Sequence, residues 1–568
     1  MAIGRFACAV LCFAVSFAHA PSSRAQEASP YVEVLEVGLT NVDVVATDKA
    51  GNPITGLKPA DFEVFEDGKP QAITHFAEVG SQGASAVILP EGGAAAEPSA
   101  APAPARKFIF YIDDSNLTLD NRRSVFPAIR KFLASNLRSG DRAMVVTWNR
   151  ELKVRVPWTA DLATVDAALQ ALAGETNGAS QLYAQKQQVE RLLTKMEEEA
   201  LEPDNKLAPL WSELENAARA YAENAKIEFT QSTNAIVRLL ATLTGVDGKK
   251  VLVMATEALP TMAGAEMFEH LENIRAAAMV SPTSTLRGEA GKGSRITDLS
   301  RYNLQTTLEV LIRAANASDI TVYGINPKGL GGPAEGKAGQ QNTRATNLDF
   351  VSSDQQLAGI NMLANRTGGV AMVGAPADMA LERVGRDLNA YYSLGYRSTK
   401  GLSPERKVEV RAKRPGVQVR TRTNVYYRSL EREMADRVIA NQIQSEQANK
   451  LGIALEADAA TTDGTRKLLP VRVIIPVSTL TLLPGANGGV TGGFSVFTVS
   501  ADGSGGTSGV NVQSQSISFT AEQAAQMKGR RIGFAIQVPL EKGRDRISVG
   551  VLDHVSHEQG FATLKAAL

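Results

Sequence analysis

The sequence predicts an α/β protein with a doubly wound, mostly parallel sheet, flanked along the chain by β-sandwich segments. Apolar strands that lack a polar alternation recur between amphipathic helices across residues 107–390. This pattern is typical of a parallel sheet covered on both faces. The segments before and after this region alternate apolar and polar residues between turn signals, as sandwich strands do.

Composition and turn signals divide the 568 residues further, and a chain of this length is expected to hold roughly two to four domains. We expect a signal peptide (1–25), an N-terminal β segment (31–79), an Ala/Pro/Gly linker (80–106), an α/β domain (107–390) with a helical insertion (180–243), a β hairpin that pairs with the N-terminal segment (391–428), a helix and linker (429–466) and a C-terminal β domain (467–568).

The first 25 residues have the pattern of a secretory signal peptide. Arg5 supplies a short positive region, and residues 6–18 form an apolar run too short to span a bilayer. The tripeptide SRA at 23–25 fits a cleavage site better than AHA at 18–20, because a cut after AHA would leave Pro21 directly behind it. We therefore expect an exported protein, periplasmic or extracellular.

The cysteines and the charge balance narrow the class of protein. Cys8 and Cys12 both lie in the signal peptide, so the mature chain relies on its cores rather than on disulfides. Leu11 stands directly before Cys12, where a lipidation site has a small residue. No later run of about 18 apolar residues occurs, so no transmembrane span is expected. Lys+Arg and Asp+Glu both number 60, which argues against a nucleic-acid partner.

The periodicity of apolar residues places the elements of the α/β domain. We expect strands at 108–112, 142–148, 152–156, 250–255, 320–325 and 370–373, and helices at 121–137, 162–172, 302–317, 357–364 and 378–390. The insertion reads as mostly helical and broken at 202–205, and its place beside the ligand edge of the sheet makes it a candidate lid or partner-contact surface. In the N-terminal segment, Asp67-Gly68 predicts a hairpin turn between two strands.

This order of elements resembles the von Willebrand factor A domain, and more narrowly the bacterial VWFA-related proteins first grouped in acidobacteria. The segments that carry the resemblance are VDVVATDKAGNPITGLKPADFEVFEDGKPQAITHF, GDRAMVVTWN, KKVLVMATEALP, ITVYGINPKGL, LANRTGGVAMV and DLNAYYSLGYRS. Together they cover roughly residues 31–428. The resemblance is more specific for fold than for activity, because one fold hosts many functions.

The resemblance also implies a metal-ion-dependent adhesion site after the first strand, in FIFYIDDSNLT at 108–118. The family pattern is Asp-x-Ser-x-Ser, with a Thr on a second loop and an Asp after the fourth strand. Asp113 and Ser115 match its first two positions, whereas Leu117 has no ligand oxygen where the second Ser belongs, and Thr118 is one residue late. Mg²⁺ or another divalent cation prefers such oxygen ligands.

The remaining positions of the pattern are altered in this chain. Ser180 or Thr176 could supply the Thr of the second loop, and Glu257 stands where the Asp of the fourth strand belongs. We therefore expect a degenerate, weakly binding site at most. The alternative is that Asp113 and Ser115 cap the following helix. Asp114 adds a charge that a capping role does not need.

No enzyme constellation is present in the sequence, and we expect a non-enzymatic protein. The mature chain has no thiol nucleophile, and neither a P-loop nor a G-x-S-x-G motif occurs. His554 and His557 follow a predicted strand, where a turn is the better interpretation than a metal site. We expect the edge around Asp113 to bind a protein or cell-surface ligand, and the alternative is a metal-free structural or assembly protein of the cell envelope.

Overall fold

The fold is built around a six-stranded sheet with the order β12-β11-β10-β7-β8-β9. All neighbouring pairs are parallel except β8 and β9, which are antiparallel. The strands are β7 (Arg106–Asp113), β8 (Arg142–Trp148), β9 (Leu152–Thr159), β10 (Lys249–Ala255), β11 (Ile320–Asn326) and β12 (Ala371–Val373). The predicted doubly wound, mostly parallel sheet is confirmed.

The computed structural model describes residues 37–80, 83–88, 99–101, 103–175, 181–199, 207–280, 300–327, 357–399, 404–442, 448–463, 466–485, 488–502, 506–527, 529–541 and 543–566. The expected signal peptide lies outside these residues, as does the expected break at 202–205. Val37–Leu568 forms one compact unit.

Helices cover both faces of this sheet because its central strands are apolar on both faces. On β7, Phe108 and Phe110 pack against one layer of helices, and Ile109 and Tyr111 pack against the other. The first layer contains α1 (Leu119–Asn136), α2 (Leu162–Gly174) and α9 (Ala377–Leu388). The second layer contains α4 (Leu207–Thr242), α7 (Gln305–Ala317) and a helix over residues 357–366.

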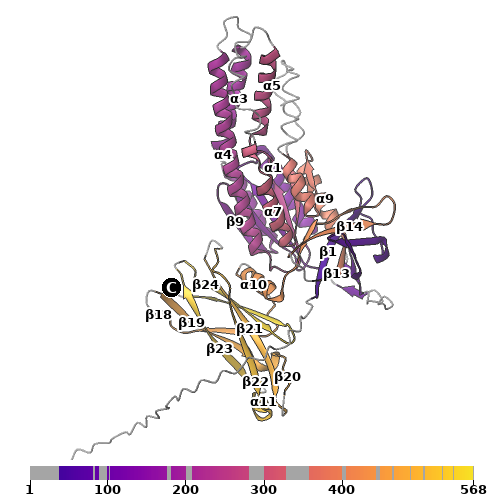
Figure 1. The fold of residues 1–568 in the computed structure, drawn as a ribbon, viewed down its shortest axis with the longest axis vertical. Helices are drawn as coiled ribbons and strands as arrows, with labels where there is room; N and C mark the ends of the chain where they lie inside the picture. The colour runs from indigo at the N-terminus through magenta and orange to yellow at the C-terminus, as the bar shows by residue number, and fades with distance from the viewer. Residues whose placement is uncertain are drawn as a thin grey trace, which may run out of the picture. The chain divides into compact units, whose positions relative to one another are not determined.

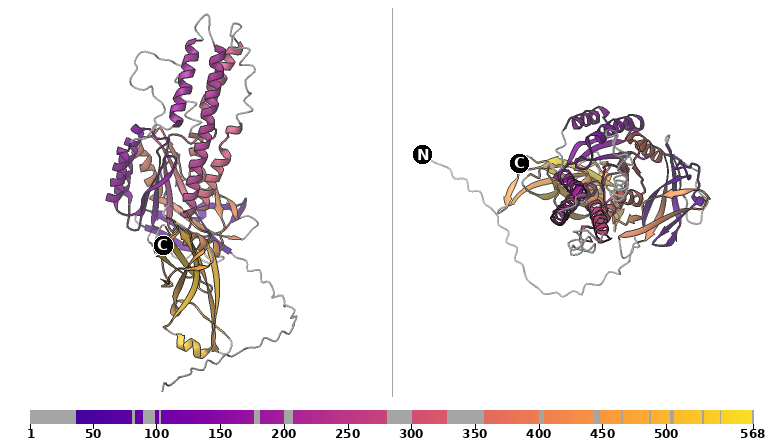
Figure 2. Two further views of the ribbon diagram at one scale, coloured as in Figure 1. Left: turned by 90° about the vertical axis from the view of Figure 1, so that its left-hand side faces the viewer. Right: turned by 90° about the horizontal axis from the view of Figure 1, so that it is seen from above.

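The helical insertion is extended. Figures 1 and 2 show its purple and magenta helices rising side by side beyond one end of the sheet. α3 (Gln181–Glu199) packs against α4, and α4 also contacts α5 (Ala265–Val280). α5 was not expected from the sequence. Among the described residues, no helix combines the length and the apolar character needed to cross a bilayer.

Two further sheets form a β-sandwich. One has the order β15-β1-β13-β4-β5-β6 and the other β16-β14-β2-β3. Their strands are β1 (Val37–Thr47), β2 (Phe62–Glu66), β3 (Lys69–Gln71), β4 (Ile73–Gly80), β5 (Gly83–Ile88), β6 (Ser99–Ala101), β13 (Ala390–Thr399), β14 (Glu405–Ala412), β15 (Gln418–Arg420) and β16 (Asn424–Tyr426). The α/β domain is thus inserted between strands that pair with one another.

Two details differ from the sequence-based expectation for this region. β13 and β14 do not form a hairpin, because β13 pairs with β1 and β4 whereas β14 pairs with β2 and β16. Their inward residues, including Tyr392 and Val408, meet in one core between the two sheets. Part of the expected linker also forms strands, since β5 extends the sheet beyond β4 and β6 pairs with β5.

The C-terminal β region contains two more sheets around their own apolar core. It starts earlier than 467, because β17 and β18 pair with β19. Its elements are β17 (Ala454–Ala457), β18 (Thr461–Asp463), β19 (Arg466–Pro476), β20 (Leu483–Pro484), β21 (Val490–Ala501), β22 (Asn511–Phe519), α11 (Ala521–Met527), β23 (Arg531–Leu540), β24 (Arg546–Asp553) and β25 (Gln559–Lys565). A short 3₁₀ turn at Val477–Thr479 follows β19, and another at Pro59–Asp61 precedes β2 in the sandwich.

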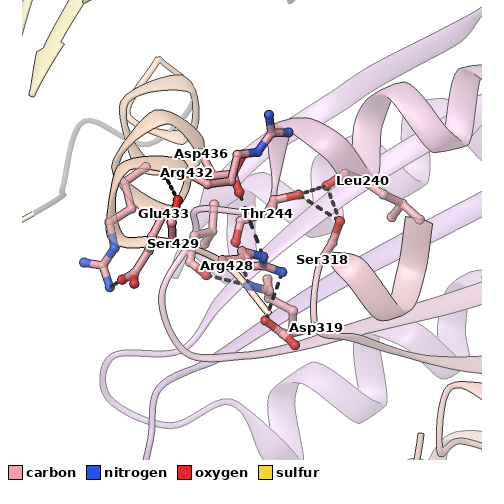
Figure 3. Close-up of polar contacts among 12 residues, drawn as sticks. Leu240, Thr244, Ser318, Asp319, Arg428, Ser429, Arg432, Glu433 and Asp436 are labelled. Carbon is pink, nitrogen blue, oxygen red and sulfur yellow. Dashed lines mark hydrogen bonds and ion pairs between the residues drawn. The ribbon is translucent and has the colours of Figure 1, made fainter. Parts of the chain in front are cut away.

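Helix α10 (Leu430–Ala440) lies between the sandwich strands and the C-terminal β region in the chain. Its Met434 and Val438 are fully buried against residues of β21, β24 and β25. Its opposite side carries charges, and Figure 3 shows Arg428 between Asp319 and Asp436. Arg428 lies 3.4 Å from Asp319 and 3.9 Å from Asp436. α10 is therefore amphipathic, with one apolar face and one face that forms ion pairs.

Candidate functional site

The carboxyl ends of the central parallel strands bring polar residues together at one edge of the sheet, where ligands of such sheets bind. Asp113 ends β7, and Thr256 and Glu257 directly follow β10. The hydroxyl of Thr256 donates to Asp113 Oδ2 at 2.8 Å. Asn326, the last residue of β11, donates to the carbonyl oxygen of Glu257 at 3.1 Å. Neighbouring strand ends are therefore joined by hydrogen bonds.

Asp113 and Ser115 each present a buried oxygen without a hydrogen-bond partner among the described residues. Asp113 is 5% exposed, and its Oδ2 accepts from Thr256 and, at 3.0 Å, from the side-chain amide of Asn116. Its Oδ1 and the Oγ of Ser115 have no such donor or acceptor. Buried polar atoms are nearly always paired in folded proteins, so this pair of oxygens is suited to an added ligand.

Burial raises the pKa of Asp113 to about 7. The hydrogen bonds from Asn116 and Thr256 lower this pKa, and the nearby negative charge of Glu228 on α4 raises it further. Removal from water disfavours the ionised carboxylate, and a bound cation would favour it.

Asp114, the second acid of the loop, is engaged by a buried arginine of α1. Its Oδ1 lies 3.4 Å from Nε of Arg122, and the two side chains are 3% and 1% exposed. Arg122 also donates to the carbonyl oxygens of Leu172 and Glu175. Burial raises the pKa of Asp114, and the charge of Arg122 opposes this rise. The charge of Asp114 is thus balanced within the protein.

Glu257 caps α1 from the neighbouring strand end. Its Oε1 accepts from the backbone amide of Thr118 at 2.5 Å and from the side chain of Asn121 at 2.8 Å. Thr118 is the N-cap residue, but its own side chain makes no cap hydrogen bond. Among the described residues, the start of α1 is thus bonded by the carboxylate of Glu257, which follows β10.

The other predicted positions are not brought into the site. Leu117, at the position of the second Ser, is 3% exposed and packs in the core under α1. It supplies apolar contact where the family pattern has an oxygen. Thr118 is exposed. Ser180 and Thr176 lie outside the described residues.

Four residues that the sequence analysis did not select contribute to the site: Asn116, Arg122, Glu228 and Thr256. Thr256 could have been found, since it is the first polar residue after an apolar strand. Arg122 and Glu228 gave no such signal, because they are ordinary charged positions on predicted helices.

The exposure of the side chains varies along this edge. Ser115 and Asn116 are half-buried, and the first turns of α1 and α9 expose Leu119 (44%) and Met379 (58%). Both helices begin where a parallel strand has just ended, so these apolar side chains belong to the same edge as Asp113. Exposed apolar side chains and the half-buried part of the loop therefore share this edge of the sheet.

The oxygens of Asp113 and Ser115 fit a hard divalent cation, which takes carboxylate and hydroxyl oxygens and keeps several waters. They do not form a complete protein cage. Within the described residues, no group of three or more His, Cys, Asp or Glu side chains is placed to hold a metal ion. A cation at this edge would depend on water or on a partner for most of its ligands.

Comparison with known proteins gives matches to solved structures. No family model matches the chain, and no curated protein matches it. Among solved structures, the fold is similar to an aerotolerance-related membrane protein from Bacteroides fragilis (11% identity, TM-score 0.22, 50% of this chain and 99% of that one). It is also similar to the vWF domain of the type V pili tip protein Mfa5 from Porphyromonas gingivalis (10% identity, TM-score 0.23, 51% of this chain and 96% of that one). A third similar structure is that of the pilus adhesin SpaC from Lactobacillus rhamnosus GG (8% identity, TM-score 0.25, 92% of this chain and 58% of that one).

Proposed function

We propose that the chain is an exported, non-enzymatic interaction protein with a von Willebrand factor A-like domain. It binds a protein or cell-surface ligand through the loops at the carboxyl edge of the sheet, with the help of a weakly held divalent cation. The observation that carries this proposal is the pair of unpartnered buried oxygens on Asp113 and Ser115, beside an exposed apolar rim.

The chemistry of the edge supports ligand recognition rather than catalysis. Asp114 and Glu257 are already engaged, by Arg122 and by the first turn of α1. Asp113 and Ser115 are then left to hold a cation, which would expose open coordination positions to an acidic group of a partner. Leu119 and Met379 would add apolar contact beside it.

Isothermal titration of the protein with Mg²⁺ and Mn²⁺ tests the cation. We expect weak binding that disappears in Asp113→Ala and in Ser115→Ala. Asp161→Asn is the matched control, because Asp161 is an exposed N-cap aspartate of α2 that starts at the opposite edge of the sheet. Equal heats in all variants would contradict the site.

The ligand is tested separately by capture from envelope extract with and without EDTA. Capture that needs the cation and is lost in Asp113→Ala supports the proposal. Capture that is insensitive to EDTA and to Asp113→Ala would show that binding uses another surface.

A metal-free structural or assembly role in the cell envelope is the second candidate. It is favoured by the internal use of Glu257 and Asp114, since both acids stabilise the fold instead of facing a ligand. The absence of heat with either cation, together with an unchanged thermal midpoint in EDTA, would favour this role over the first.

A further inference from the structure

Strand β22 forms one edge of the five-stranded sheet in the C-terminal β region. It pairs along its whole length with β21, from Asn511 opposite Thr498 to Phe519 opposite Val490. No other described strand pairs with it. One row of backbone N–H and C=O groups of this nine-residue strand therefore faces away from the sheet.

The composition of β22 sets it apart from the other edges of this protein. Its sequence, NVQSQSISF, contains neither a charged residue nor a proline. Among the described edge strands longer than three residues, every other strand carries at least one charged residue or proline. These residues are Lys153, Arg155 and Pro157 in β9, Glu456 in β17, Arg531 and Pro539 in β23, and Lys565 in β25. Charges and prolines at edges prevent strands from pairing between molecules. β22 lacks this protection.

The strand is also presented to solvent on both faces. Val512 is 47% exposed, and only Ile517 of its residues is buried. Ser514 is held in place by a hydrogen bond of 2.8 Å between its hydroxyl and that of Ser495, which in turn lies 2.8 Å from His554 Nε2. The exposed edge is thus a fixed template rather than a frayed end.

We propose that β22 pairs antiparallel with β22 of a second copy of this chain, across a twofold axis at Gln515. This register uses all nine residues and sets Ser514 of one copy opposite Ser516 of the other, where their hydroxyls can exchange hydrogen bonds. It brings no charge against its own copy, which self-pairing of a charged strand would do. A charged partner strand would find no complementary charge on β22.

The resulting dimer is expected to be weak. One pair of strands is a small interface beside the roughly 1,200–2,000 Å² that stable complexes bury. We therefore expect the dimer to form at high protein concentration and to dissociate on dilution.

Sedimentation velocity of the whole protein over a concentration series is the test. We expect a monomer–dimer equilibrium for the natural sequence and monomers for Gln515→Lys and Gln515→Glu, because each places a like charge against itself on the axis. An equimolar mixture of the two variants should dimerise again, which a folding defect could not produce. Gln537→Lys, at an exposed position of the already protected edge strand β23, should leave the equilibrium unchanged.

The outcomes are distinct. A natural protein that stays monomeric at every concentration overturns the proposal and leaves the edge to a strand of another protein. Dimers that persist in both single variants place the interface elsewhere. Failure of the mixture to dimerise, with both variants folded by circular dichroism, also overturns it.

Discussion

Glu257 joins two strand-end loops: its Oε1 lies 2.5 Å from the backbone nitrogen of Thr118, the N-cap residue of α1. We expect Glu257→Ala to lower the free energy of unfolding by about 1–2 kcal/mol, the usual cost of losing a helix N-cap. Glu257→Gln keeps an oxygen for the same two donors and should cost less. Urea denaturation of the three proteins measures the difference.

The same variants separate a cap from a metal ligand. If Glu257 acts only as the cap, Glu257→Gln should bind Mg²⁺ as the natural protein does. A loss of cation binding in Glu257→Gln, with stability preserved, would assign Glu257 to the metal instead.

Asp114 and Arg122 form a buried ion pair beside the site, so removal of one charge should be costly. We expect Asp114→Ala to destabilise the protein by about 3–5 kcal/mol, since it leaves the buried guanidinium of Arg122 without its carboxylate. Asp120→Ala is the control, because Asp120 is exposed and pairs with Arg123 at the surface. Equal loss of stability in both variants, measured by urea denaturation, would show that the buried ion pair contributes no more to stability than the surface pair does.

Lys250 should make stability depend on pH in the alkaline range. Burial lowers its pKa to about 8, and its ammonium donates to the carbonyl oxygens of Thr244 and Val246. Between about pH 8 and 10.5 the unfolded chain holds this proton and the folded chain releases it. Stability should therefore rise with pH through this window. Below the window the contribution of Lys250 to stability should not change with pH.

The contribution of Lys250 is isolated by comparison with Lys250→Met. In the variant two carbonyl groups lose a donor, and its stability should rise less between pH 8 and 10 because the buried amine is gone. Parallel pH profiles from urea denaturation would contradict the lowered pKa.

Gly245 allows α10 to approach the end of α4. A Cβ at this position would lie 2.3 Å from the backbone of Asp436, which cannot move as a flexible side chain could. We expect Gly245→Ala to displace α10 and to increase tryptic cleavage at Arg432 and Arg437. Gly174→Ala is the control, because no atom lies within 4 Å of its added Cβ. Unchanged cleavage in Gly245→Ala would show that α10 is not held by this contact.

The sequence predicted the central sheet well because its signals are local. Apolar strands such as 142–148 are delimited by polar turns, and β8 (Arg142–Trp148) has those bounds. α5 was missed, since Ala265–Val280 lacks a strong amphipathic pattern and was not recognised between two better-marked elements. Within the hairpin expected at 391–428, β14 pairs with β16, whereas β13 pairs with β1 and β4, because alternation predicts a strand but does not identify its partner.

For the candidate site, the sequence determined which residues stand at the strand ends. Asp113, Ser115 and Glu257 follow apolar strands, and parallel strands place such residues at one edge. Only the tertiary structure decided their roles: Glu257 bonds the start of α1, Arg122 balances Asp114, and one oxygen each of Asp113 and Ser115 stays without a partner. The local sequence pattern determines at which end of a strand a residue stands, whereas the hydrogen bonds of its side chain depend on residues that are distant in the chain.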